Sequence, residues 1–248
     1  MKKIFLWAFI GLIILIILIL ALAPARAILP WITDKVPGLV LTNPQGSIWS
    51  TKVDSLQINR LRINNLQLNI SPWSLLLGNL SSELSLDDEN LKLNGDIRLN
   101  NDVAEVNGLV YQLDSRWLKQ FVKAPINDIS GIIKGELESA KVQHKQKIVE
   151  DLSGFGTWNN AIIDYPNYRL ELGNFSYKLS NHEKVARITI IDNDGLLDLK
   201  GHIDIDLNNR YQMQLNTQEN LPENIKRWLR AFAKTENGRM YIQWQGNW

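Results

Sequence analysis

The stretch SLQINRLRINNLQLN, from Ser55 to Asn69, decides the fold class of this chain. It divides into the pentads SLQIN, RLRIN and NLQLN, each with apolar residues at its second and fourth places and Asn at its fifth. Leu56 and Ile58, two residues apart, would lie on opposite sides of a helix, so the pattern excludes an amphipathic helix. Spacing of two is typical of a β-strand with one apolar face.

The apolar spacing slips by one residue between pentads. Leu56 and Leu61 therefore differ in parity, and an unbroken strand would point them to opposite faces. An extra residue at 59 or 60, and another at 64 or 65, restores the face, and Asn tolerates the bulged or left-handed backbone that this needs. A pentapeptide-repeat β-helix is the alternative, although it needs many consecutive pentads. The pattern predicts a bent, twisted strand system with one apolar face.

The same alternation continues along the chain, and it is interrupted by turn signals such as Asn94-Gly95 and Asn237-Gly238. Two short amphipathic helices are predicted, over 114–123 and 222–234. The predicted strands are Leu84–Leu86, Leu91–Leu99, Val103–Leu113, Ile129–Leu137, Phe155–Ile163, Tyr168–Leu172, Phe175–Leu179, Val185–Ile191, Leu196–Leu207, Tyr211–Asn216 and Arg239–Trp244. The fold class is thus mostly β, a curved and twisted antiparallel sheet that forms an open barrel or a groove.

The N-terminus carries an apolar run from Ile4 to Ala23. About 20 apolar residues make a helix of about 30 Å, enough to span a bilayer, and Lys2 and Lys3 favour a cytoplasmic N-terminus. Ala25-Arg26-Ala27 has the form of a signal-peptidase site, but the run is longer than a signal peptide needs. We therefore expect a transmembrane anchor over residues 1–27 and an exported β domain over residues 28–248.

Composition offers little support for catalysis. The 248 residues carry a formal net charge of +1 and no cysteine, so there is no electrostatic footprint for nucleic acid and no thiolate chemistry. The three histidines have no metal-ligand spacing, and no nucleophile, phosphate-loop or dinucleotide motif is present. We expect no enzyme activity, no cofactor, no metal site and no nucleic-acid partner.

The two predicted helices point to an internal duplication. WLKQFVKA at Trp117 matches WLRAFAKT at Trp228, and three further short matches follow the same order at a nearly constant offset. The predicted repeat units are residues 39–139 and 140–248. Five of the nine tryptophans are candidate packing or interface residues, since aromatic side chains dominate cores and interfaces. They are Trp49, Trp117, Trp158, Trp228 and the terminal Trp248.

Several segments together resemble the bacterial type II secretion system protein N family across nearly the whole chain. These are GSIW (46–49), SPWSLLLG (71–78), SGIIKGELES (130–139), LSGFGTWNNAIID (152–164), GLLDLKGHIDIDLNNRYQMQLNT (195–217) and NGRMYIQWQG (237–246). Each motif is short, and their order carries the likeness. The ending NGRM is shorter than the glycine-rich ending that the family leads one to expect.

This resemblance implies an accessory protein of the bacterial inner membrane, single-pass, with its C-terminal domain in the periplasm. It would take part in the export of folded periplasmic proteins by contacting other type II secretion components, and it implies no catalytic residues. A more distant architectural likeness, to AsmA- and TamB-like proteins, implies the alternative of a periplasmic groove that binds or transfers lipid.

Overall fold

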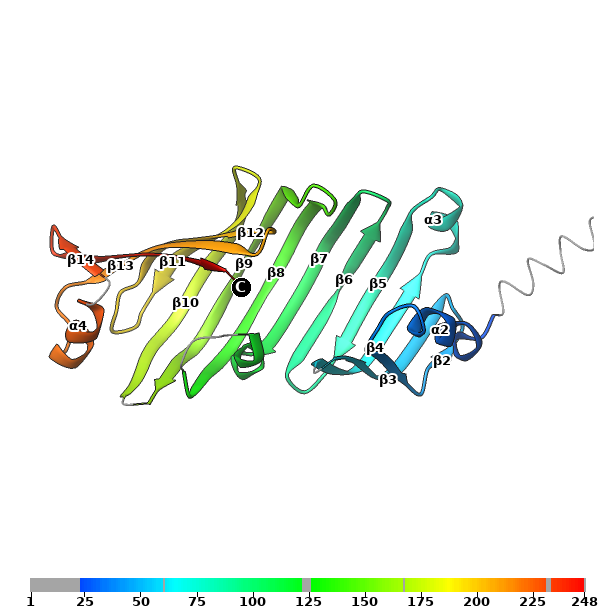
Figure 1. The fold of residues 1–248 in the computed structure, drawn as a ribbon, viewed down its shortest axis with the longest axis horizontal. Coiled ribbons are helices and arrows are strands. Elements are labelled where there is room, and N and C mark those ends of the chain that lie inside the picture. The colour runs from blue at the N-terminus through cyan, green and yellow to red at the C-terminus, as the bar shows by residue number, and fades with distance from the viewer. Residues whose placement is uncertain (1–22, 60, 122–125, 167, 231–232, 248) are drawn as a thin grey trace, which may run out of the picture. The chain divides into compact units, whose positions relative to one another are not determined.

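The computed structural model describes residues 23–59, 61–121, 126–166, 168–230 and 233–247. The chain divides into two compact units, residues 1–89 (unit 1) and residues 90–248 (unit 2). Strands dominate both units (Figure 1). Within the described ranges, no helix is both long and apolar enough to cross a membrane. Residues 1–22 of the predicted anchor lie outside the described residues.

Unit 1 is a small antiparallel sheet in the order β1-β3-β4-β5, with the short β2 paired to β3. Two short helices flank its strands. The elements are α2 (Ala25–Thr33), β1 (Leu39–Thr42), β2 (Gln45–Gly46), β3 (Ser50–Ile58), β4 (Leu61–Ile70), α3 (Pro72–Leu76) and β5 (Leu80–Asp87). The sequence did not predict β1 and β2, which are too short to show a period.

The pentads form a hairpin, which corrects the prediction of a bulge after the first pentad. Ile58 pairs directly with Leu61, so the chain reverses at Asn59, whose φ of 54° is left-handed. Asn65, at the second slip, is also left-handed, with φ 53°. Asn favours this backbone because its side chain bonds locally, and a two-residue hairpin turn requires it. A left-handed asparagine thus accounts for both slips: Asn59 lies in the hairpin turn, and Asn65 lies within β4.

The single apolar face predicted for the pentads does not extend through β3. The buried positions there are Thr51, Val53 and Ser55, alternating with exposed ones. Leu56 and Ile58 fall on the other parity, and Ile58 is exposed. Alternating side chains of one strand point to opposite faces, so the two sets cannot share a side.

Unit 2 is an open antiparallel sheet in the order β6-β7-β8-β9-β10-β11-β12-β13-β15-β14, and β6 and β14 do not pair with each other. Its strands are β6 (Leu91–Leu99), β7 (Val103–Asp114), β8 (Asp128–Gln143), β9 (Ile148–Tyr165), β10 (Tyr168–His182), β11 (Val185–Asn193), β12 (Lys200–Asp206), β13 (Arg210–Gln218), β14 (Ala233–Glu236) and β15 (Arg239–Asn247). Figure 1 shows β13 and β15 running at a marked angle to β6–β10, as sheet twist requires. The predicted open, mostly antiparallel fold is confirmed.

Both predicted helices are present, and the second is shorter than predicted. The first is a 3-10 helix, η1 (Ser115–Phe121), whose start is capped by Asp114 through a 2.9 Å bond from the Arg116 amide. The second is α4 (Glu223–Leu229), which ends before the predicted limit of residue 234. Asn237 and Gly238 have φ of 52° and 75°, the geometry of a two-residue hairpin turn. That turn pairs Ala233–Glu236 with β15 and so ends the helical pattern early.

Candidate functional site

Side chains alternate regularly along β6, the first strand of unit 2. In β6 the even positions carry Lys92, Asn94, Asp96 and Arg98, all exposed, while Leu91 and Gly95 on the odd positions are buried. Side chains on the apolar side of the next strands, such as Leu137 and Leu179, are only half-buried. The face of unit 2 that carries these leucines, called the apolar face, is therefore partly open over β6–β10, and it is the candidate site.

A row of directly opposed residues crosses this face. Leu93, Tyr111, Gly135, Gly156 and Tyr177 lie on five neighbouring strands in that order. A Cβ placed on Gly135 would lie 2.4 Å from the Tyr111 hydroxyl, and one on Gly156 would lie 2.5 Å from that of Tyr177. Each tyrosine ring therefore lies over the glycine of the neighbouring strand, a position that only glycine leaves open.

The two tyrosines meet above the glycines. Their hydroxyl oxygens are 2.9 Å apart, so one donates a hydrogen bond to the other. Burial raises the pKa of Tyr177, and the bond with Tyr111 raises it further. Burial also raises the pKa of Tyr111, and the hydrogen bond with Tyr177 partly offsets this rise. Both hydroxyls are thus held neutral at physiological pH, and the pair is suited to packing and hydrogen bonding rather than to proton transfer.

One end of the face is closed by α4. Ile225 and Leu229 of this helix pack with Leu215, Met240 and Ile242 of β13 and β15 in the main buried cluster of unit 2. The cluster continues to Phe175 on β10, which stacks on the ring of Trp158 with centroids 5.7 Å apart. The apolar face is therefore filled toward the C-terminal strands.

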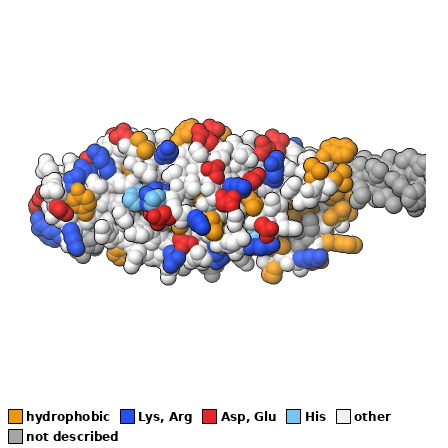
Figure 2. Space-filling model, turned by 90° about the horizontal axis from the view of Figure 1, so that it is seen from above, with side chains coloured by type: hydrophobic (Ala, Val, Ile, Leu, Met, Phe, Trp, Pro, Cys, Tyr) orange, Lys and Arg blue, Asp and Glu red, His pale blue; other side chains and the backbone are white. Residues whose placement is uncertain are grey.

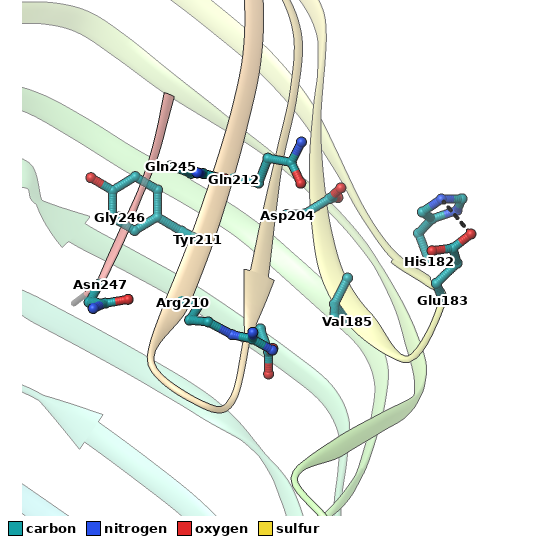
Figure 3. Close-up of a pocket in the computed structure, with 11 residues that line it drawn as sticks. His182, Glu183, Val185, Asp204, Arg210, Tyr211, Gln212, Gln245, Gly246 and Asn247 are labelled. Atoms are coloured by element: carbon teal, nitrogen blue, oxygen red, sulfur yellow. Dashed lines mark hydrogen bonds and ion pairs between the residues drawn. The ribbon is translucent and has the colours of Figure 1, made fainter. Parts of the chain in front are cut away.

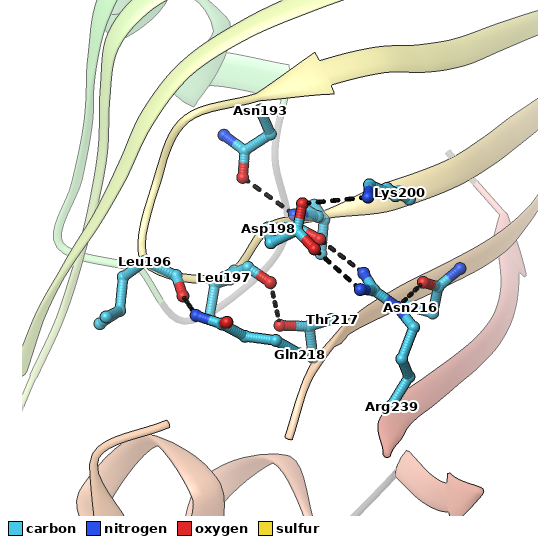
Figure 4. Close-up of polar contacts among 10 residues, drawn as sticks. Asn193, Leu196, Leu197, Asp198, Lys200, Asn216, Thr217, Gln218 and Arg239 are labelled. Carbon is cyan, nitrogen blue, oxygen red and sulfur yellow. Dashed lines mark hydrogen bonds and ion pairs between the residues drawn. The ribbon is translucent and has the colours of Figure 1, made fainter. Parts of the chain in front are cut away.

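A polar clasp holds the loop between β11 and β12 over this cluster (Figure 4). Arg239 donates from Nη1 to the Asp198 carboxylate (2.8 Å) and from Nη2 to the Asp198 carbonyl (2.7 Å). The hydrogen bond from Arg239 is the main cause of a lowered pKa at Asp198. Buried Asn193 donates to the Leu172 carbonyl (2.8 Å) and accepts from the Leu199 amide (2.9 Å). These bonds fix the loop, so its polar groups serve the fold.

A polar pocket of about 600 Å³ opens at the other ends of β10–β13 (Figure 3). Two of its three carboxylates, those of Asp204 and Asp206, are already paired with arginines. Asp204 accepts two hydrogen bonds from Arg187 (2.6 and 2.7 Å). These bonds are the largest of several causes that lower the pKa of Asp204. Asp206 accepts bonds from the Asn208 amide and from Arg210, which also lower its pKa. Both carboxylates are ionised and engaged near neutral pH, which makes them poor general acids or bases.

Three of the five predicted tryptophans have side chains that the structure describes, and each of these lies in a different element or loop. Trp49 is half-buried, and its carbonyl accepts a 2.7 Å bond from the Ile70 amide. Trp117 is half-buried in η1, which contacts β8, and Trp158 lies on β9. The backbone of Trp228 lies in α4, but its side chain, like all of Trp248, is outside the described residues. The duplication inferred from Trp117 and Trp228 stays a prediction.

The row of Tyr111, Gly135, Gly156 and Tyr177 was not predicted from the sequence. A signal was present, since Gly135, Gly154 and Gly156 interrupt apolar strands, and glycine inside a strand often marks a close approach of another group. The register needed to bring Tyr111 and Tyr177 onto these glycines is not visible in the sequence. Among the residues described, no group of three or more His, Asp or Glu is placed to hold a metal ion.

Comparison with known proteins gives one match. The model of the type II secretion system protein N family matches residues 37–244, which takes in most of unit 1 and nearly all of unit 2. No curated protein and no solved structure matches the chain. Since the match extends over most of the sequence, including the pentads, the glycine strands and the C-terminal hairpin, this chain belongs to the type II secretion system protein N family.

Proposed function

We propose that this protein is a non-enzymatic accessory component of the type II secretion system that acts through protein–protein contacts. The family match over residues 37–244 is the observation that carries the proposal. In this role the protein assists the export of folded periplasmic proteins across the outer membrane. Residues 4–23 anchor it in the inner membrane, with Lys2 and Lys3 on the cytoplasmic side and the β units in the periplasm.

The chemistry of unit 2 supports a binding role. Asp204 and Asp206 of its pocket are engaged by Arg187 and Arg210, and its tyrosine pair is held neutral. Basic and acidic side chains are interspersed on the face drawn in Figure 2, without a large area of one sign. Such a surface suits contacts with other folded proteins more than the attraction of a polyanion.

Two features at the C-terminal end of unit 2 supply contact groups for a partner. Strand β14 is the last strand of the sheet and spans only Ala233–Glu236, so it offers a short free edge. On the neighbouring strand, Trp244 is 51% exposed and donates a 3.2 Å bond to the Tyr211 hydroxyl. A fixed, half-exposed tryptophan is a typical anchor of protein interfaces.

Deletion of the gene tests the proposal. Enzymes normally released by the system should accumulate in the periplasm, and the full-length gene should restore their release. A Trp244→Ala variant should restore release less well if this aromatic contacts a partner, whereas the exposed Lys178→Ala variant should restore it fully. Normal release from the deletion strain under all growth conditions would argue against a role in secretion.

The half-open apolar face favours one further candidate, a lipid-binding groove. Leu93, Leu137 and Leu179 lie on this face without being buried. A photocrosslinker at Leu93 or Leu137 should then capture lipid in cells, and one at Lys134, on the opposite face, should not. Crosslinks that join these positions only to the protein's own α4 or η1 would eliminate this candidate.

A further inference from the structure

The helix α3 exposes an apolar surface that nothing in unit 1 covers. Trp73 is 76% exposed, Leu76 77% and Leu77 79%, and the helix has no buried residue. Figure 2 shows hydrophobic side chains gathered over this end of unit 1. Single exposed apolar residues are common on proteins, but a contiguous tryptophan and leucine tip marks a surface that meets an apolar partner.

The tip carries no charge and satisfies part of its own backbone. No charged residue lies between Arg62 and Glu83. The amides of Leu77 and Gly78 bond back to carbonyls within the helix, at 3.1 and 3.0 Å. Ser74 closes the base, since its hydroxyl donates to the Ser71 carbonyl (2.7 Å) and accepts from the Ser81 amide (3.0 Å). These internal bonds lower the cost of moving the tip out of bulk water, and the polar interfacial region of a bilayer can still bond the helix-end groups that remain.

The tip lies at the end of unit 1 where the N-terminal apolar run arrives. The carbonyl of Ala23, the last residue of that run, accepts a 3.0 Å bond from the Ile48 amide. The next residue, Trp49, accepts a 2.7 Å bond from the amide of Ile70, which directly precedes the α3 segment. Two backbone bonds thus connect the end of the apolar run to the start of the tip.

The helix α2 adds a second exposed aromatic near this point. Trp31 is 76% exposed and lies six residues, about 9 Å of helix, after Ala25, where α2 begins. Tryptophan prefers the boundary between lipid tails and water. Unit 1 therefore presents two exposed tryptophans within reach of the residue where a membrane span would end.

We propose that α3 is a membrane-docking element, with Trp73, Leu76 and Leu77 inserted into the interfacial region of the bilayer that residues 4–23 enter. This inference rests on the anchoring in the proposed function. It adds a second point of attachment, which fixes the orientation of unit 1 against the membrane surface. The ligand is the phospholipid bilayer itself.

The test uses the absence of cysteine, which allows one label per molecule. The full-length variants Leu76→Cys and Phe155→Cys carry an environment-sensitive dye and are reconstituted into phosphatidylethanolamine–phosphatidylglycerol vesicles containing nitroxide-labelled lipid. Phe155 is the matched control, an apolar side chain of unit 2 that is 53% exposed. At position 76 the emission should shift to shorter wavelength and be quenched by the labelled lipid, and at position 155 it should do neither.

The outcomes separate this inference from the anchoring itself. Protein that does not float with the vesicles refutes both. Protein that floats, but whose dye at position 76 stays as exposed as at position 155, refutes docking by α3 alone. A dye that leaves water only when other membrane proteins are added shows that α3 binds protein, and it overturns the inference.

A second variant tests the apolar character of the tip. Leu76→Asp should abolish lipid quenching of a dye at Leu77→Cys without unfolding the protein, because the Leu76 side chain makes almost no internal contact at 77% exposure. Circular dichroism should match that of the parent. Quenching that persists in the Leu76→Asp protein would contradict insertion.

Discussion

Substitution of Gly156 by alanine should destabilise unit 2 markedly. The added methyl would lie 2.5 Å from the Tyr177 hydroxyl oxygen, 2.6 Å from its Cζ and 2.7 Å from the Lys134 carbonyl oxygen. Contacts between carbon and these atoms are normally well above 3 Å, so the ring must leave and the strands must move apart. Since the carbonyl belongs to the backbone of β8, a side-chain rotation alone cannot relieve the clash.

The magnitude follows from two opposing effects. Overpacking by one methyl group in a fixed contact costs about 1–3 kcal/mol. Replacing glycine by alanine returns about 0.4–1 kcal/mol by restricting the unfolded chain. Because three contacts are violated, we expect the upper part of the range and a net loss of about 2 kcal/mol. Gly135→Ala, whose methyl would lie 2.4 Å from both the Phe155 carbonyl and the Tyr111 hydroxyl, should lose as much.

The assay is urea unfolding of the full-length protein in mild detergent, followed by circular dichroism and analysed by linear extrapolation. Lys134→Ala is the control, an exposed change beside Gly135 that should stay within about 0.5 kcal/mol of the parent. If both glycine variants unfold at the parental urea concentration, the tyrosines do not lie over the glycines and the register across β7–β10 is wrong.

Three further predictions address the same unit. Tyr111→Phe and Tyr177→Phe should each lose about 1 kcal/mol and the double variant little more than either, a coupling of about 0.5–1.5 kcal/mol in a double-mutant cycle; additive losses would mean that the hydroxyls do not meet. Arg187→Gln should lose about 1.5–3 kcal/mol near pH 7. The Asp204 pKa is lowered by folding, so this stabilisation is present above the unfolded pKa of about 3.9 and is lost as pH falls through the folded value; a loss in the variant that is as large at pH 2 as at pH 7 would refute the pairing. Leu229→Ala, at a side chain that is 1% exposed, should lose about 2–5 kcal/mol in thermal or urea unfolding, and a near-neutral result would mean that α4 does not pack on the sheet.

The sequence was sufficient to predict a strand where polar and apolar residues alternate clearly along it. The limits of β6 match the prediction at both ends, since polar residues alternate with Leu91, Leu93 and Ile97 and Asn100 follows the strand. The prediction divided β10 into two strands at Gly173, which instead forms a bulge with φ 75° inside one strand. A glycine bulge and a glycine turn have the same local signal, and only the pairing partner distinguishes them.

Tertiary pairing explains most of the other differences. The helical pattern over 222–234 is real as far as Leu229, but hydrogen bonds from β15 take over the residues from Ala233. The tyrosine pair joins residues that are 66 positions apart, so no local rule could find it. The exposure of Trp73 was equally hidden, because a Trp-Leu run is more often part of a core.

The central claim, a component that works by contact with other secretion proteins, is tested most directly by isolating the full-length protein from its native membranes. After brief crosslinking in cells, the chains that co-purify with it are identified by mass spectrometry. Other type II secretion proteins should co-purify with it, and in larger amounts than from cells that carry the Trp244→Ala variant. Recovery of the protein with lipid alone, and with no secretion protein above background, would contradict this claim.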